Sequence, residues 1–137
     1  TSESEIHKAD NSYFNKLINS IKIKELIQFE STVKTGYFVD EVEEEATVRM
    51  TIALFSKNKL NLEPIFKGIG NLEMGLDPAI AQRIYFFSEE SNNYFHMYDD
   101  RGCRICADSP QKIRPVFEKY NTWIVDYYRP RIEKQFQ

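Results

Sequence analysis

The chain has 137 residues, which is the length of one domain, and 42% of them are hydrophobic, enough for a packed core. Its net charge of −3 disfavours nucleic acid as a main partner, because neutralising phosphates requires clustered Lys and Arg. The longest apolar run, Ile52 to Phe55, is far shorter than the roughly 20 residues of a membrane helix. With no apolar signal-peptide core after the N-terminus, we expect a cytoplasmic protein that contacts no membrane.

The first ten residues, Thr1 to Asp10, are polar, lack periodicity and begin without Met, so we interpret 1–10 as a flexible leader. Residues 11–137 are predicted to form a single α+β domain. Asn11 or Ser12 can cap a helix, and a break in it is predicted near Ser20. That helix is predicted from apolar residues at helical spacing, namely Phe14, Leu17, Ile18, Ile21, Leu26 and Ile27.

Strict alternation from Thr47 to Phe55 predicts a half-buried strand with Val48, Met50, Ile52 and Leu54 on one face. Its hairpin partner is predicted at Tyr37 to Val39, across an acidic turn from Asp40 to Glu45.

Further along, a short helix with Pro64 in its first turn is predicted from the spacing of Leu62, Ile65, Phe66 and Ile69. Gly68, Gly70 and Gly75 are then expected to break regular structure. Three strands are predicted at Arg83–Phe87, Tyr94–Tyr98 and Cys103–Ala107, and Ser109 followed by Pro110 begins a helix whose apolar stripe reaches Tyr127. The expected fold is α+β, with an antiparallel β-sheet meander packed by an N-terminal helix and C-terminal helices.

The segment Asp99-Asp100-Arg101-Gly102 separates two of these strands. Paired carboxylates beside Arg can form a ligand clamp or a buried acid cluster. The structural interpretation is a tight hairpin, in which an Asp oxygen starts the turn and Gly102 supplies a positive φ. We favour the hairpin.

The residues Asp40, Glu41, Glu43, Glu44 and Glu45 place five carboxylates in six positions. Their mutual repulsion is characteristic of a solvated loop, or of one half of an electrostatic interface with a basic partner. We expect a loop, which is also the best candidate for partner contact.

His96 shares a strand face with Tyr94 and Tyr98, and no second histidine or recognisable nucleophile accompanies it. We therefore expect no enzyme, no metal and no cofactor. Cys103 and Cys106 lie three residues apart on a strand and point to opposite faces, which suits neither a disulfide nor a zinc pair.

Trp123, Tyr127 and Tyr128 lie beside Arg129 and Arg131, the residue types that dominate protein-binding hot spots. Because Trp123 and Tyr127 continue the apolar stripe of the last helix, we instead favour their packing in the core.

The segments 95–103, 113–121 and 123–127, together with Asn71-Leu72-Glu73-Met74-Gly75, resemble a bacterial family known only as a domain of unknown function. The resemblance covers about Thr47 to Phe136. Arg104, Thr122 and Tyr128 depart from the pattern, because family members often carry Asp there, and a functional acid cluster would be depleted here. The resemblance implies a fold and a bacterial origin rather than a mechanism.

Small acidic bacterial domains without catalytic machinery are similar to immunity proteins, which neutralise secreted toxins in bacterial competition such as contact-dependent growth inhibition. We therefore expect a monomer that binds a cognate, basic toxin, often a nuclease, and occludes its active site. The expected contact residues are Asp40, Glu41, Glu43, Glu44, Glu45, Asp99 and Asp100. One alternative is a small-ligand or enzymatic domain that uses Asp99, Asp100, Arg101 and His96. Another is a structural or regulatory module that homodimerises through the sheet edge or through Trp123 and the terminal tyrosines.

Overall fold

A computed structural model describes residues 12–21, 23, 25–39 and 42–137 of the chain. Helix α1 (Ser12–Asn19) precedes strands β1 (Glu25–Val39) and β2 (Val42–Leu54), a 3-10 turn (Lys57–Lys59) and helix α2 (Glu63–Met74). Strands β3 (Phe86–Ser88), β4 (Asn93–Asp99) and β5 (Gly102–Ala107) follow, and then α3 (Pro110–Lys119), a 3-10 turn (Asn121–Trp123), α4 (Arg129–Glu133) and a last 3-10 turn (Lys134–Phe136). The predicted leader, Thr1 to Asp10, lies outside the described residues.

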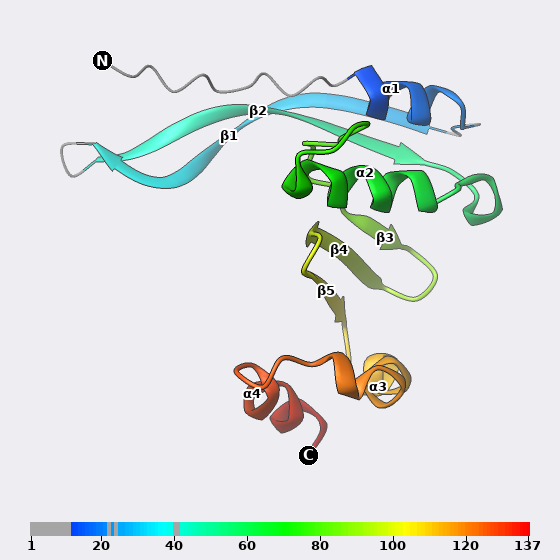
Figure 1. Ribbon diagram of the computed structural model, residues 1–137, viewed down its shortest axis with the longest axis vertical. Helices are drawn as coiled ribbons and strands as arrows, with labels where there is room; N and C mark the ends of the chain where they lie inside the picture. The colour runs from blue at the N-terminus through cyan, green and yellow to red at the C-terminus, as the bar shows by residue number, and fades with distance from the viewer. Residues whose placement is uncertain (1–11, 22, 24, 40–41) are drawn as a thin grey trace.

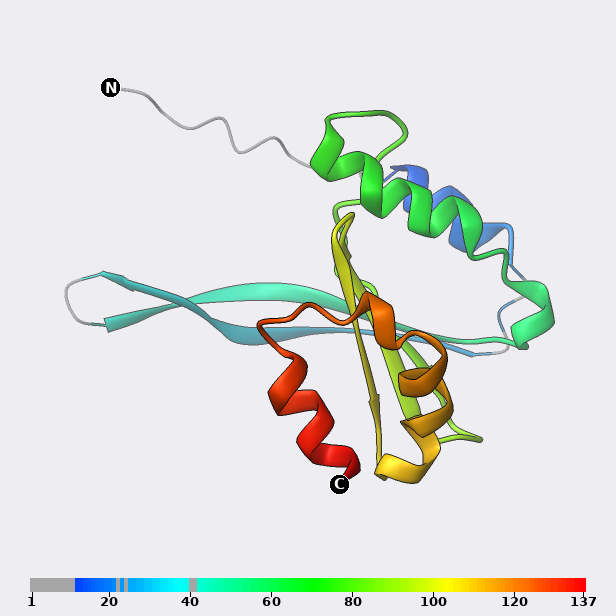
Figure 2. The ribbon, with the colours of Figure 1, turned by 60° about the horizontal axis from the view of Figure 1, so that its bottom comes forward.

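The fold is α+β, as expected, and its strands form two separate antiparallel sheets (Figure 1). The predicted meander is confirmed in the sheet of order β3-β4-β5. The other sheet is a two-stranded ribbon of β1 and β2, which projects well beyond the helices and the meander in both views of the molecule (Figures 1 and 2).

The core lies between α2 and the meander. Ile65 and Ile69 of α2 are buried together with Ile80 from the segment that follows the helix. Phe66 meets Phe86 and Phe95 edge to face, with ring centroids 5.7 and 5.5 Å away. Such pairs add directional stabilisation to the burial of the rings.

Helices pack at both ends of the chain. The residues Tyr13, Phe14 and Leu17 of α1 pack against the core cluster, and α3 lies against β5 (Figure 2). Both placements match the expected covering of the sheet by terminal helices. Among the described residues, every helix is too short or too polar to pass through a bilayer.

The N-terminal helix is shorter than predicted. It ends at Asn19, and Leu26 and Ile27 belong to β1 instead. Ile27 continues a period of two through Phe29 and Val33, and this alternation competes with the helical spacing that links Leu26 and Ile27 to the residues before them. The prediction of one helix through Ile27 was therefore wrong.

Helix α2 is longer than predicted, because Gly68 and Gly70 lie inside it rather than breaking it. The helix ends where Gly75 adopts φ 66°, a left-handed conformation that glycine takes without steric cost. Pro64 lies in the first turn, as expected. The buried face of the helix outweighs the propensity cost of two interior glycines.

The last long helix breaks earlier than predicted, after Lys119. The guanidinium of Arg129 donates hydrogen bonds to the Asn121 side-chain and backbone oxygens at 2.9 and 3.1 Å and to the Ile124 backbone oxygen at 3.0 Å. These bonds satisfy carbonyls that a continuous helix would pair internally, so they stabilise the bent path between α3 and α4.

Candidate functional site

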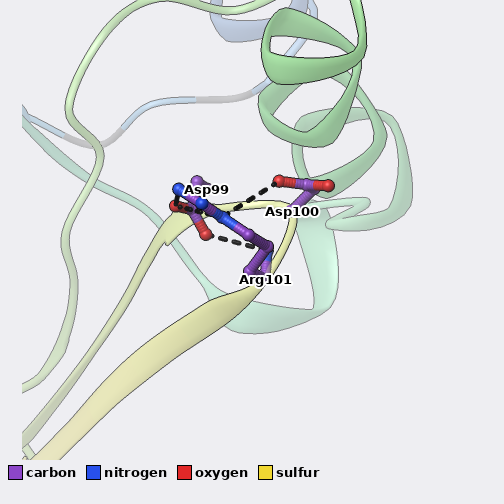
Figure 3. Close-up of polar contacts among 3 residues, drawn as sticks. All are labelled: Asp99, Asp100 and Arg101. Atoms are coloured by element: carbon purple, nitrogen blue, oxygen red, sulfur yellow. Dashed lines mark hydrogen bonds and ion pairs between the residues drawn. The ribbon is translucent and has the colours of Figure 1, made fainter.

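The two-residue hairpin loop between β4 and β5 consists of Asp100 and Arg101, with Asp99 opposite Gly102 in the register (Figure 3). One Asp99 oxygen, Oδ1, accepts a hydrogen bond from the Arg101 backbone N–H at 2.8 Å. The other, Oδ2, accepts from Nε and Nη2 of Arg101 at 3.2 and 2.6 Å. Asp99 is buried, and both of its oxygens serve the turn, so the hairpin interpretation fits the geometry.

Asp99 and Arg101 each stabilise the charged form of the other. The bound Arg101 side chain lowers the pKa of Asp99, and Asp99 in turn raises the pKa of Arg101. The glycine of the turn has a different role from the one predicted, because Gly102 does not adopt a positive φ. Instead, a Cβ at Gly102 would collide with the hydroxyl end of Tyr98.

His96 is buried and has a structural environment. Its Nδ1 lies 2.8 Å from the Ile84 carbonyl oxygen, and its ring stacks on Tyr85 with centroids 4.1 Å apart. The two nearby cysteines are free thiols opposite Met97 and Tyr94 in the register. Partial burial raises the pKa of the Cys103 thiol, which lowers its fraction of reactive thiolate.

Cavities lie elsewhere on the surface. One of about 330 Å³ lies between α1 and the segment 77–81, and one of about 190 Å³ lies where β5 meets α3. Neither is lined by the β4–β5 turn or by His96. Within the part of the chain that the structure describes, no three His, Cys, Asp or Glu side chains come together as a metal site would require.

The acidic run differs from the predicted loop. Glu43, Glu44 and Glu45 lie in β2, while Asp40 and Glu41 lie outside the described residues. Glu43 Oε1 accepts a hydrogen bond from the Gly36 N–H at 3.2 Å, and its Oε2 pairs with Lys34 Nζ at 3.4 Å. Glu44 and Glu45 are exposed in the same stretch of β2.

The apolar face of the ribbon is a feature that sequence reasoning underestimated. The pairs Ile27–Ile52 and Phe29–Met50 lie directly opposite each other, so their side chains share one face. These four side chains are 43–52% exposed. Alternation along β2 correctly placed Met50 and Ile52 on one face. A half-buried strand implies that this face is buried, and that part of the prediction was wrong.

The C-terminal aromatics are also more exposed than predicted. Trp123 is 76% exposed and Tyr127 is 84% exposed, so neither packs in the core. Trp123 contacts Tyr120 with ring centroids 4.9 Å apart, and Tyr127 meets Tyr128 edge to face. The break after α3 removes Trp123 from the helical stripe that had suggested burial.

One motif behind the family resemblance has a structural explanation. The buried Asn71 side chain donates a hydrogen bond to the Pro78 oxygen at 2.9 Å, and its backbone oxygen accepts from Leu76 N–H at 2.9 Å. The segment Asn71-Leu72-Glu73-Met74-Gly75 therefore ends α2 and directs the chain back toward Ile80. The contacts of this segment are structural rather than catalytic.

Comparison with known proteins agrees with this unassigned character. The chain is 39% identical over 103 residues to a Bacillus subtilis (strain 168) protein called "Uncharacterized protein YnaE", a match that covers 69% of this chain and 48% of that protein. The chain thus spans about half the length of this relative. No solved structure matches the chain. The family match begins well before Thr47, where the resemblance from motifs began. The chain belongs to the bacterial family described as "Domain of unknown function (DUF3885)", whose model matches residues 2–128.

Proposed function

We propose that this chain is an immunity-type inhibitor that binds a basic toxin domain and occludes its active site. The observation that supports the proposal is the pair of exposed carboxylates, Glu44 and Glu45, at the far end of a ribbon that projects from the molecule (Figure 1). A projecting acidic end can reach into a basic cleft that would otherwise hold nucleic acid.

The hydrogen bonds of the acidic residues narrow the proposed contact set. Glu43 is held by Lys34 and Gly36, and Asp99 is held by Arg101, so these carboxylates have internal roles. Glu44 and Glu45 remain for intermolecular contact, together with the exposed Asp100, whose Oδ1 forms only a long ion pair with Arg101 Nε at 3.9 Å. Exposed charges of this kind accelerate encounter more than they add affinity, so salt should weaken binding.

The alternative of a ligand or enzymatic site has less support. It would use Asp99, Asp100, Arg101 and His96. Asp99 and Arg101 bind each other, and His96 stacks on Tyr85 and lies within hydrogen-bond distance of the Ile84 carbonyl oxygen. If the turn bound a substrate, the contacts that hold the hairpin would have to break.

The test is titration of the purified chain with the protein encoded by its neighbouring gene, at low and high salt. We expect a tight complex with the two chains in a one-to-one ratio. Its dissociation constant should rise with salt. Replacing Glu44 and Glu45 with Lys should weaken binding at least about tenfold and flatten its salt dependence, because attraction becomes repulsion.

The matched control replaces Glu89 and Glu90 with Lys, which changes the net charge equally at an exposed turn beside β3. This control should alter binding by less than about twofold, the scale of long-range charge effects in salt. Equal effects of the two double variants would contradict contact through the ribbon, and the absence of any complex would contradict the proposed function.

A further inference from the structure

The β1–β2 ribbon has one apolar and one polar face. One face of the ribbon carries Ile27, Phe29, Ser31 and Val33 of β1 and, opposite them, Ile52, Met50, Val48 and Ala46 of β2. The opposite face carries mainly polar residues such as Gln28, Thr32, Arg49 and Thr51, with Arg49 paired to Glu30 at 3.8 Å. Seven of the eight residues on the first face are apolar, so this is an amphipathic ribbon rather than a mixed one.

The apolar face lacks a cover among the described residues. Ile52, Phe29 and Met50 are each 43–52% exposed. Of the strands that the structure describes, β1 and β2 pair only with each other. An isolated two-stranded ribbon is marginally stable in water and needs a further strand, helix or sheet against its apolar face. The ribbon therefore needs a covering surface that is present whenever the chain folds.

The total area of the molecule shows that it exposes more surface than a compact monomer would. The chain exposes 11,674 Å², whereas a compact monomer of its mass exposes roughly 7,500 Å². Even if the residues outside the described ranges are allowed the full area of an unfolded chain, roughly 2,400 Å², an excess of about 1,800 Å² remains. A stable dimer of standard size takes about 800 Å² from each partner, and the excess over the whole molecule, to which the ribbon's apolar face contributes, is larger than that.

We propose that a second copy of this chain covers the apolar face, with the two ribbons packed face to face around a twofold axis near Ser31. A second copy is present whenever the chain is synthesised, and an apolar face without unpaired charge suits its own duplicate. The seven-residue apolar stretch is about 23 Å long, and two such faces can pack at the usual sheet separation of about 10 Å.

The charges determine the direction of the two ribbons. A parallel arrangement would bring the Glu44 and Glu45 side chains of both copies together, which is unfavourable. In the antiparallel arrangement, the acidic ends point away from each other, and the helices and meanders lie at opposite ends. The dimer replaces the expectation of a monomer, but it uses different residues from the proposed toxin contact and does not depend on it.

The test begins with the molar mass of the full chain by light scattering over a range of micromolar concentrations. We expect twice the chain mass of 16.2 kDa. Phe29→Lys, on the apolar face, should dissociate the dimer, whereas the charge-matched neighbour Gln28→Lys, on the polar face, should leave the mass unchanged. A monomer at every concentration, or a dimer that persists in Phe29→Lys, would overturn the proposal.

A second measurement remains informative if Phe29→Lys fails to fold. In a background with Cys103 and Cys106 replaced by Ser, Ser31→Cys should form an intermolecular disulfide under mild oxidation, because the axis passes near it. Thr32→Cys, one residue along on the opposite face, should remain monomeric on a non-reducing gel. Equal cross-linking of the two variants would refute face-to-face packing, and toxin binding is measured separately so that either proposal can fail alone.

Discussion

Gly68 and Ile80 approach so closely that a side chain at position 68 has no room. A Cβ built on Gly68 would lie 2.7 Å from both Cδ1 and Cγ1 of Ile80, and the Gly68 backbone oxygen accepts a hydrogen bond from Ile80 N–H at 2.9 Å. Ile80 is 1% exposed. The interior glycine of α2 thus permits the segment after the helix to return and close the core.

Replacing Gly68 with Ala should destabilise the domain by about 1–3 kcal/mol, because Ile80 is too tightly enclosed to move away. Gly70→Ala is the matched control in the same helix, since its Cβ would meet Asp100 Cβ and Met74 Cε at ordinary distances of 3.8 and 3.9 Å. It should be neutral or stabilising by up to about 1 kcal/mol through helix propensity. Urea unfolding of both variants checks this; a Gly68→Ala protein as stable as Gly70→Ala would contradict the close packing.

Replacing Asn71 with Ala should cost about 1–3 kcal/mol, because the part-buried Pro78 oxygen loses the hydrogen bond that the amide donates. Asn58→Ala, at an exposed position in the turn after β2, should change the free energy of unfolding by less than about 0.5 kcal/mol. The measurement is thermal or urea unfolding. Similar losses in both variants would show that the Asn71 bond contributes nothing specific.

Acid should weaken the domain through Asp99. Its pKa is lowered in the folded state, so the ionised carboxylate stabilises the fold above the ordinary carboxyl pKa of about 3.9. This contribution disappears as the pH falls through the folded pKa, when Asp99 becomes protonated. We therefore expect Asp99→Asn to be less stable than the original chain at pH 7 and to lose less stability on acidification.

Asp126→Asn is the control for the pH experiment, because the Asp126 side chain is fully exposed and solvent screens its 3.5 Å ion pair with Arg129. Its urea denaturation curves at neutral and acid pH should parallel those of the original chain. If Asp99→Asn shows the same acid loss as the original chain, the link between Asp99 ionisation and stability fails.

The sequence predicted local structure well where one signal dominated. Turn chemistry at Asp99 and the Ser109-Pro110 start placed the meander and α3 near their observed positions. It failed at β1, where Leu26 and Ile27 fit both a helical and a strand period, and at the run of glutamates, where charge suggested a loop but cross-strand pairing with Lys34 and Thr35 forms a strand. Nearby residues alone do not reveal such pairing.

The candidate surfaces depended on tertiary packing and were therefore harder to predict. Periodicity shows which side chains share a face, but whether that face is covered depends on where other elements lie. Met50 and Ile52 were assigned to the correct face with the wrong burial, and Trp123 was assigned to a helix that ends before it. In both cases the apolar residue is exposed because no distant segment among those described packs over it.

Trp123 is the only tryptophan in the chain, which makes its exposure directly measurable. Because its side chain is 76% exposed, its fluorescence should be red-shifted in the folded protein and readily quenched by iodide. Trp123→Ala should change the free energy of unfolding by less than about 0.5 kcal/mol, as surface substitutions do, rather than the roughly 3–5 kcal/mol that truncating a core tryptophan costs. Phe117→Ala provides the contrast, because Phe117 is half-buried and stacks on Phe136 with centroids 4.1 Å apart. A blue-shifted, protected Trp123 would mean that something covers this surface in solution, and that the C-terminal aromatics form an interface.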